Sequence, residues 1–284
     1  MNYKSSIGLH LRTKDNVTEL AQEAADLEVQ YFQFFLTTPK TGKYLTLTAK
    51  DKQSFVALRR EHCKDIFIHS SYWINPSTYN KDVYELSKRL LRRELIAAGA
   101  LEIQYLVLHA GSAKGHVVTE QDPLAKQPGI DTLAKMINSL TKRATGIKIL
   151  IENSAHGKRT IGNDLDDLLI LRQKLDFPDR IGFCIDTGHA FSYGYQLEPI
   201  DDFIALLDQK LGLSNIKLIH FNDVQDKQGT MLDRHAFPGL GTMGKEMLQP
   251  FLHHKQLLHI PKIIEGPTCS KNTIISLLND IRTW

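Results

Sequence analysis

The segment Ile181-Gly-Phe-Cys-Ile-Asp-Thr-Gly-His-Ala-Phe191 begins with a short, nearly continuous hydrophobic run that ends at Asp186. Apolar residues that do not alternate with polar ones are typical of a strand covered on both faces, as in a parallel sheet. The run therefore predicts a buried strand whose last residue is a carboxylate.

The same pattern recurs along the chain. Apolar runs bounded by polar residues lie at eight places, residues 6–11, 29–36, 65–70, 103–109, 147–153, 181–186, 216–223 and 262–266. Helix-like segments with start and stop signals lie between and after these runs. They cover residues 15–27, 51–63, 81–98 closed by Gly99, 130–144 closed by Gly146, 163 or 164 to 175, 201 or 202 to 211, 245–254 and 270–282.

Eight strand-then-helix units predict a right-handed (β/α)8 TIM barrel, a fold that uses about 250 residues as one unit. The chain has 284 residues and no Gly-, Ser- or Pro-rich linker, so we expect one domain over residues 1–284. An open, doubly wound sheet is the alternative. The loop after the first run has no GxGxxG and no GKS or GKT follows later, which disfavours it and a nucleotide site.

Composition bounds the function only loosely. The net charge is +3, from 35 Lys and Arg against 32 Asp and Glu, so charge alone neither requires nor excludes a nucleic-acid partner. The three cysteines, Cys63, Cys184 and Cys269, have no CxxC spacing, which favours a reducing compartment. Neither a signal peptide nor a membrane span is evident, and we expect a cytoplasmic protein.

Polar residues gather where the predicted strands end. In a parallel barrel the carboxyl ends of all strands open on one rim, where catalytic groups collect. Six consecutive strands are expected to deliver an imidazole or a carboxylate to this rim, namely His69, His109, Glu152, Asp186, His220 and Glu265. His189 follows the sixth strand, and Asp233 with His235 follows the seventh, so the pool reaches nine side chains.

So many ionisable groups without Arg or Lys require positive charge in their midst. Imidazole and carboxylate ligands without thiolate suit Zn²⁺, Mn²⁺ or Fe in an open site, with zinc favoured, and nine ligands fit three ions. A single histidine at a strand end is more often structural, so the hypothesis depends on the joint pattern. We expect His10 to support ligands rather than bind metal, and Asn153, Asn222 and Asp223 to orient ligands or loops.

At this point the chain resembles the endonuclease IV family, the zinc-dependent apurinic/apyrimidinic (AP) endonucleases. The resemblance extends over about residues 60–266. It is carried by the segments His69-Ser-Ser-Tyr-Trp-Ile-Asn75, Leu-His109-Ala-Gly-Ser112, Ile-Glu152-Asn-Ser-Ala155, Cys184-Ile-Asp-Thr-Gly-His-Ala-Phe191, His220-Phe-Asn-Asp223, Asp233-Arg-His235 and Glu265.

The resemblance implies a trinuclear zinc site. One ion would be held by His69, His109 and Glu152, and a second by Glu152 as a bridge with Asp186, His220 and Glu265. The third would be held by His189, Asp233 and His235.

The activity that the resemblance implies is hydrolysis of the phosphodiester 5′ to an abasic site in duplex DNA, leaving a 3′-hydroxyl and a 5′-deoxyribose phosphate, together with trimming of blocked 3′ ends. Glu265 would take or orient the proton of the attacking water, and Glu152 would act as the bridging catalytic carboxylate.

The resemblance also implies DNA contacts. Tyr72 and Trp73 match apolar wedges that enter the minor groove, although ordinary packing over the rim is the alternative. The segment 37–44 lacks the Arg- and Trp-containing pattern of the family's DNA-penetrating loop, which puts intercalation there in doubt, while Lys40 and Lys43 remain candidate phosphate contacts. Family members act alone, so we expect a monomer.

Two other classes compete with a nuclease. A sugar isomerase or epimerase of the related barrel group uses fewer ligands, typically two Glu, one Asp and one His, around one or two ions. The set His189, Asp233 and His235 separates the nuclease from it. A binding protein that has lost catalysis is the third hypothesis, and the intact ligand set argues against it.

Overall fold

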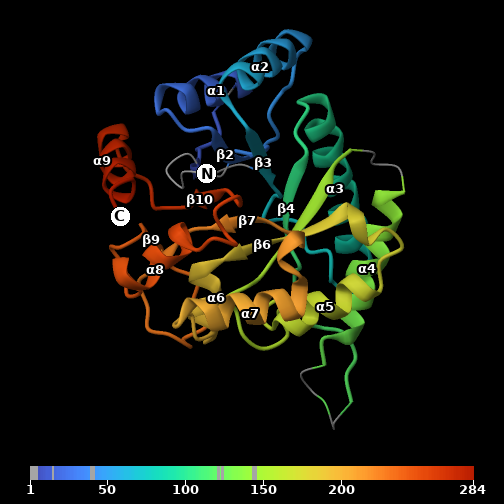
Figure 1. Cartoon of the computed structure of the whole chain (residues 1–284). Coiled ribbons are helices and arrows are strands. Elements are labelled where there is room, and N and C mark those ends of the chain that lie inside the picture. Colours follow the sequence, from blue (N-terminus) through green and yellow to red (C-terminus); the bar gives the residue numbers. More distant parts are fainter. Residues whose placement is uncertain (1–5, 15, 39–41, 120–121, 123–124, 143–145) are drawn as a thin grey trace.

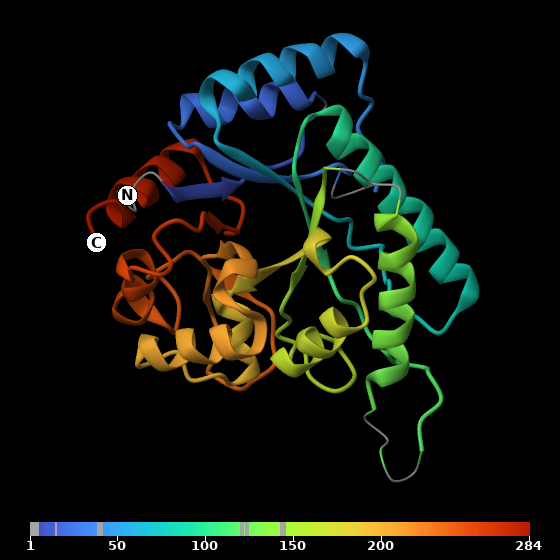
Figure 2. The ribbon, with the colours of Figure 1, turned by 45° about the vertical axis from the view of Figure 1, so that its right-hand side comes forward.

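The computed structural model describes residues 6–14, 16–38, 42–119, 122, 125–142 and 146–284. Eight parallel strands form a closed barrel in the order β1-β10-β7-β6-β5-β4-β3-β2, and helices surround it (Figures 1 and 2). The barrel strands are β1 Ile7–His10, β2 Tyr31–Phe35, β3 Asp65–His69, β4 Tyr105–His109, β5 Lys148–Glu152, β6 Ile181–Asp186, β7 Ile216–His220 and β10 Lys262–Ile264. The predicted (β/α)8 barrel is therefore confirmed.

The helices alternate with the strands as predicted, but several begin or end at other residues than expected. They are α1 Val17–Asp26, α2 Ala49–His62, α3 Lys81–Ala100, α4 Gln127–Thr141, α5 Leu165–Gln173, α6 Thr187–Tyr193, α7 Ile200–Leu211, α8 Gly244–His253 and α9 Lys271–Ile281. The predicted stop at Gly99 is wrong, because α3 continues to Ala100 and the chain turns at Glu102, which has φ 55°. Helix α4 begins earlier than predicted, with Pro128 in its first turn.

Two elements near the rim were not predicted. Helix α6 starts directly after β6 and carries His189, where the sequence predicted no helix. The predicted seventh strand, 216–223, is shorter than expected, because β7 ends at His220 and residues Asp223–Val224 (β8) pair with His235–Ala236 (β9) as a separate antiparallel ribbon. The extended loop expected to hold Asp233 and His235 is therefore partly a β-ribbon.

Two apolar layers hold the barrel together. Inside it, six fully buried side chains fill the space between the strands, Phe67, Val107, Leu150, Cys184, Leu218 and Ile263. A larger layer packs the outer face of the strands against the helices. Gly8 lets β1 approach β2 closely, because a Cβ there would lie 2.1 Å from the Tyr31 carbonyl oxygen. Within the described residues, no helix is both long enough and apolar enough to cross a membrane.

Candidate metal centre at the carboxyl rim of the barrel

All nine predicted ligand side chains meet at the carboxyl ends of the strands. Five are the last residues of β3 to β7, namely His69, His109, Glu152, Asp186 and His220. Glu265 follows β10, His189 lies in α6, and Asp233 and His235 belong to the segment that forms β9. Seven of the nine line a cavity of about 430 Å³, and Asp186 and His220 lie beneath it, fully buried.

The donor atoms form three groups in which every atom lies within 4.8 Å of the others. The groups are His69, His109 and Glu152; Glu152, Asp186, His220 and Glu265; and Asp186, His189 and His235. Asp233 adjoins the third group, because its carboxylate oxygens lie 3.3 Å from His189 Nε2 and 3.2 Å from His235 Nε2. Glu152 belongs to two groups and Asp186 to two, so the three sites share ligands.

Helix α6 is built around this cluster. The Asp186 side chain caps it by accepting a hydrogen bond from the backbone N–H of His189, at 2.7 Å. Asn222 donates to the other oxygen of Asp186 at 2.6 Å, and Asn153 accepts from the Asp186 backbone at 2.6 Å. The asparagines expected to orient ligands therefore do so, and one carboxylate fixes a strand end and a helix start together.

Asp223 organises the loop between β9 and α8. Its carboxylate accepts backbone hydrogen bonds from Gly239, Gly241, Met243 and Gly244 at 2.9–3.1 Å. A Cβ at Gly241 would lie 2.3 Å from the nearer Asp223 oxygen, so the backbone requires glycine there to approach the carboxylate.

Gln33 is a buried polar residue that sequence reasoning missed. Its Nε2 donates to Glu265 Oε1 at 2.6 Å, so its Oε1 must accept from His220 Nε2, at 3.0 Å. The other ring nitrogen, His220 Nδ1, faces the carboxylates of Glu152 and Glu265, at 3.0 and 3.1 Å. The signal available in the sequence was a lone amide within the apolar run Tyr31-Phe-Gln-Phe-Phe35.

His10 contacts the same Glu265 oxygen as Gln33. Its Nδ1 lies 3.0 Å from Glu265 Oε1, and burial lowers the pKa of His10. This agrees with the expectation that His10 supports a ligand. Glu265 thus has one oxygen held by Gln33 and His10, and the carboxylate remains partly exposed to the cavity, at 16%.

The histidines and carboxylates of the cluster shift the pKa values of one another. Burial opposes a charge on Glu152, but His109 and His220 outweigh it and hold the pKa of Glu152 well below its usual range. Burial likewise opposes a charge on His189, but Asp186 and the other carboxylates raise the pKa of His189 well above its usual range. Burial lowers the pKa of His109 to about 4. The carboxylates therefore keep their charge and draw positive charge to the site.

The residues present fit a set of divalent cations. Nitrogen and oxygen donors converge without a lysine or arginine in the described cavity lining. His235 Nε2 is buried and makes no hydrogen bond with any described residue, although it faces two carboxylates. A cation bound by His235 and its neighbours would satisfy this atom.

The candidate DNA-contact residues lie on the rim. Tyr72 and Trp73 are 78% and 70% exposed, and the Tyr72 ring lies over the cluster, with its centroid 5.0 Å from Phe35 and 6.0 Å from His69. Lys43 is exposed, and Lys40 lies outside the described residues. The two aromatic side chains are therefore available to a ligand and are not packed beneath other residues.

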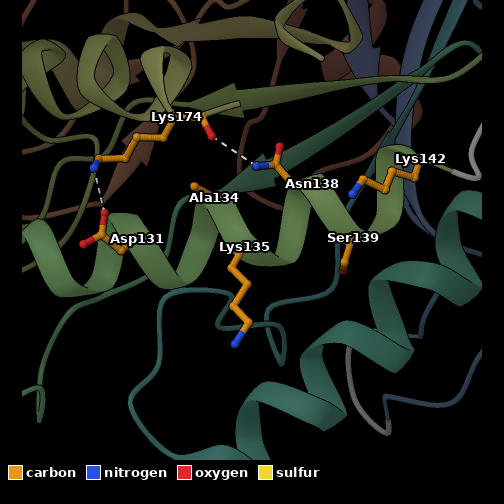
Figure 3. A pocket seen from close by; sticks show the side chains of 7 residues that line it. All are labelled: Asp131, Ala134, Lys135, Asn138, Ser139, Lys142 and Lys174. Atoms are coloured by element: carbon orange, nitrogen blue, oxygen red, sulfur yellow. Dashed lines mark hydrogen bonds and ion pairs between the residues drawn. The ribbon is translucent and has the colours of Figure 1, made fainter. Parts of the chain in front are cut away.

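Another hollow, of about 480 Å³, lies along α4 beside Lys174 (Figure 3). Lys174 pairs with Asp131 at 2.9 Å, and Asn138 donates to the Lys174 carbonyl, so polar groups there already satisfy one another. No histidine is present in its lining. The chemistry-bearing cavity is the one at the rim.

Fold and site together define a (β/α)8 barrel with a histidine- and carboxylate-rich cluster at its carboxyl rim. Residues 21–275 match the family model of the xylose isomerase-like TIM barrels. The chain is 30% identical over 267 residues to proteins named probable endonuclease 4 from Nitrosopumilus maritimus and from Thermosipho africanus, with 92% of this chain and 93% and 92% of those proteins covered.

The crystal structure of endonuclease IV from Thermus thermophilus aligns with a TM-score of 0.85 and 26% identity over 98% of both chains. A D-tagatose 3-epimerase-like protein aligns at 0.69 and 18% identity, again over 98% of both chains, which shows the shared fold alone. The chain belongs to the xylose isomerase-like TIM barrel family and, within it, to the endonuclease IV family.

Proposed function

We propose that this protein is a zinc-dependent AP endonuclease of duplex DNA. It hydrolyses the phosphodiester 5′ to an abasic site, leaves a 3′-hydroxyl and a 5′-deoxyribose phosphate, and trims blocked 3′ ends. The observation that carries the proposal is the third ligand group, in which His189, His235 and Asp233 meet Asp186 beside the two other groups. Three cation sites in one cavity suit a phosphodiester, whose oxygens carry charge through the reaction.

His69, His109 and Glu152 would hold one cation, Glu152, Asp186, His220 and Glu265 a second, and His189, Asp233 and His235 a third. Zinc is the favoured metal, with Mn²⁺ or Fe as alternatives at some positions. Bound cations in such a site lower the pKa of water, neutralise phosphate oxygens and stabilise a departing alkoxide.

Glu265 is placed to handle the proton of the attacking water. Gln33 and His10 fix one of its oxygens, while the carboxylate still reaches the cavity. Glu152 is almost fully buried, at 1%, and belongs to two ligand groups, so its carboxylate would offer a ligand to a cation in each. The water oxygen bonds to phosphorus as the bond to the 3′ oxygen breaks, and no covalent adduct with the protein is required.

An abasic nucleotide offers selectivity without base readout. It has no base to unstack or unpair, so turning it into the cavity costs less than extruding an intact nucleotide. Tyr72 and Trp73 project from the rim as apolar side chains that would enter the minor groove and open the duplex. Lys40 and Lys43 would meet phosphates. We propose that residues 1–284 act as one domain and as a monomer in the cytoplasm.

The test is cleavage of a duplex oligonucleotide with one tetrahydrofuran abasic analogue, beside the same duplex without the lesion. A single nick on the 5′ side of the analogue, with a 3′-hydroxyl product, is expected, and extension by a polymerase identifies that end. A 3′-phosphoglycolate duplex tests trimming separately. Absence of cleavage by fully metallated protein would exclude the proposal.

Metal analysis separates this proposal from a sugar isomerase or epimerase, whose fold is shared. About three equivalents of zinc per chain support the nuclease. About one equivalent, together with epimerase activity on ketoses, would favour the alternative.

A further inference from the structure

The loop that carries Tyr72 and Trp73 is fastened to α3 by buried polar side chains. Ser87 and Glu94 are fully buried, at 0%, and lie seven residues apart, on one face of the helix. Ser87 Oγ accepts from the backbone N–H of Asn75 at 3.0 Å, and Glu94 Oε1 accepts from that of Ser71 at 3.2 Å. The face of α3 toward this loop is therefore polar where the loop needs acceptors.

The same Glu94 oxygen also holds a second rim segment. Tyr44 donates its hydroxyl to Glu94 Oε1 at 2.9 Å. Tyr44 forms an antiparallel bridge with Thr37, and the guanidinium of Arg93 lies over the Tyr44 ring, 3.9 Å from its centroid. One buried oxygen thus joins the segment before Tyr72 to the paired residues Thr37 and Tyr44.

The two segments also meet directly at the exposed indole. Gly42 adopts φ 62°, and a Cβ built on it would lie 2.9 Å from Trp73 Nε1. The backbone at Gly42 therefore supports Trp73 from one side, while 70% of that residue stays exposed.

Burying Glu94 is costly for a purely structural residue. Its Oε2 is buried and has no hydrogen-bond partner among the described residues, and burial raises the pKa of Glu94 to about 7. An apolar side chain of similar length would fill the same space at lower cost. Oε1 accepts both hydrogen bonds in either protonation state, because the proton sits on Oε2.

We propose that Glu94 is a positioning residue that holds the Tyr72–Trp73 segment and residues 42–44 as one preorganised unit against abasic duplex DNA. This inference rests on the proposed function for the identity of the ligand. Glu94 itself touches no substrate, and its effect is on DNA binding, because it fixes the wedge before the duplex arrives.

The test compares Glu94→Met, which keeps length and removes the acceptor, with Glu94→Gln, which keeps a carbonyl acceptor. Glu94→Met is expected to raise KM for the tetrahydrofuran duplex about tenfold while kcat changes less than about threefold, since it removes two hydrogen bonds outside the cluster. Glu94→Gln is expected to restore KM to within about threefold of the parent. Bound metal stays unchanged in both variants.

Trp73 provides a readout that needs no DNA. The chain has two tryptophans, and Trp284 is 6% exposed, so a Trp73→Phe variant supplies the Trp284 baseline. Acrylamide quenching of Trp73 should increase in Glu94→Met and not in Glu94→Gln. If the parent protein fails to cut abasic DNA, the proposed function fails, and quenching still decides whether Glu94 positions the wedge.

Unchanged KM and unchanged quenching in Glu94→Met would overturn the inference. An equal rise in KM in Glu94→Gln and Glu94→Met would also overturn it. If Glu94→Met does not fold, Tyr44→Phe removes one of the two hydrogen bonds alone. Its effect on KM should then vanish in a Trp73→Phe background, and strictly additive effects would contradict a common unit.

Discussion

The site has two regions: ligands at the strand ends form its floor, and the loop segments that carry Tyr72, Trp73 and Lys43 form its rim. On the floor, adjacent strands place ligands side by side in register, with His109 opposite Glu152 and Asp186 opposite His220. On the rim, the segment of Trp73 is held by Glu94 of α3 and contacts Gly42, and these two residues are distant from each other in sequence. The floor is therefore fixed by the fold itself, and the rim by a few separate contacts, so that changes to each should affect different steps.

Metal removal is expected to have the largest effect, and it acts on the ligands of the floor. Prolonged chelation is expected to abolish cleavage and to lower Tm, because Glu152 and its neighbours then repel one another and bound ions no longer favour the folded state, a linkage worth about 3 kcal/mol at 100 times Kd. Calorimetry with and without chelator, followed by zinc readdition, measures this. Trp73→Ala serves as the matched rim variant and should show the same metal-dependent shift as the parent.

Glu265→Gln tests the chemistry of the floor while it keeps the size and shape of the side chain. We expect kcat to fall about 10³-fold while abasic DNA still binds, because a neutral amide cannot take the proton of water. Single-turnover cleavage and a binding titration separate the two effects. Glu246→Gln, on α8, is the control. Cleavage by Glu265→Gln at the parent rate would remove Glu265 from the mechanism.

Trp73→Ala tests the rim, and its effect should be smaller and of another kind. KM for abasic duplex should rise about tenfold with kcat nearly unchanged, since stacking of an aromatic side chain on a base contributes about 1–3 kcal/mol. Phe177→Ala, at another exposed aromatic residue, which lies before the amino end of β6 and not at a carboxyl end, should change neither constant. A loss confined to kcat would show that Trp73 belongs to the chemistry of the floor.

The same division explains what the sequence could predict. Hydrophobic runs that end in His, Asp or Glu predict both the barrel strands and the floor, because the carboxyl ends of all strands in a parallel barrel lie at the same end of the barrel. Helix α6 was missed because Asp186 was interpreted as a strand end alone, whereas its side chain also caps a helix. The α4 boundary was misplaced because Pro128 begins the helix.

The polar supports were harder to find. Gln33 contacts residues 187 and 232 positions away, and Glu94 contacts Tyr44 across 50 positions. Nothing local distinguishes Glu94 from an exposed glutamate on a charged helix. Contacts of this kind depend on which helix face meets which loop, and that is decided only when the barrel closes.

Lys43→Gln is expected to have the smallest effect, and it tests whether residues 42–44 take part in DNA binding. A phosphate contact should contribute about two- to threefold in affinity at low salt, and its loss should reduce the slope of log K against log[salt] by about 1. Titrations of abasic and intact duplex between about 50 and 200 mM salt measure the slope, and Lys135→Gln, at an exposed position on α4, provides a matched control away from the rim. Because a phosphate contact does not depend on the lesion, the two duplexes should lose affinity equally. A loss confined to the abasic duplex would instead place Lys43 with Trp73 in recognition of the lesion, and an unchanged slope would remove Lys43 from the proposed phosphate contacts.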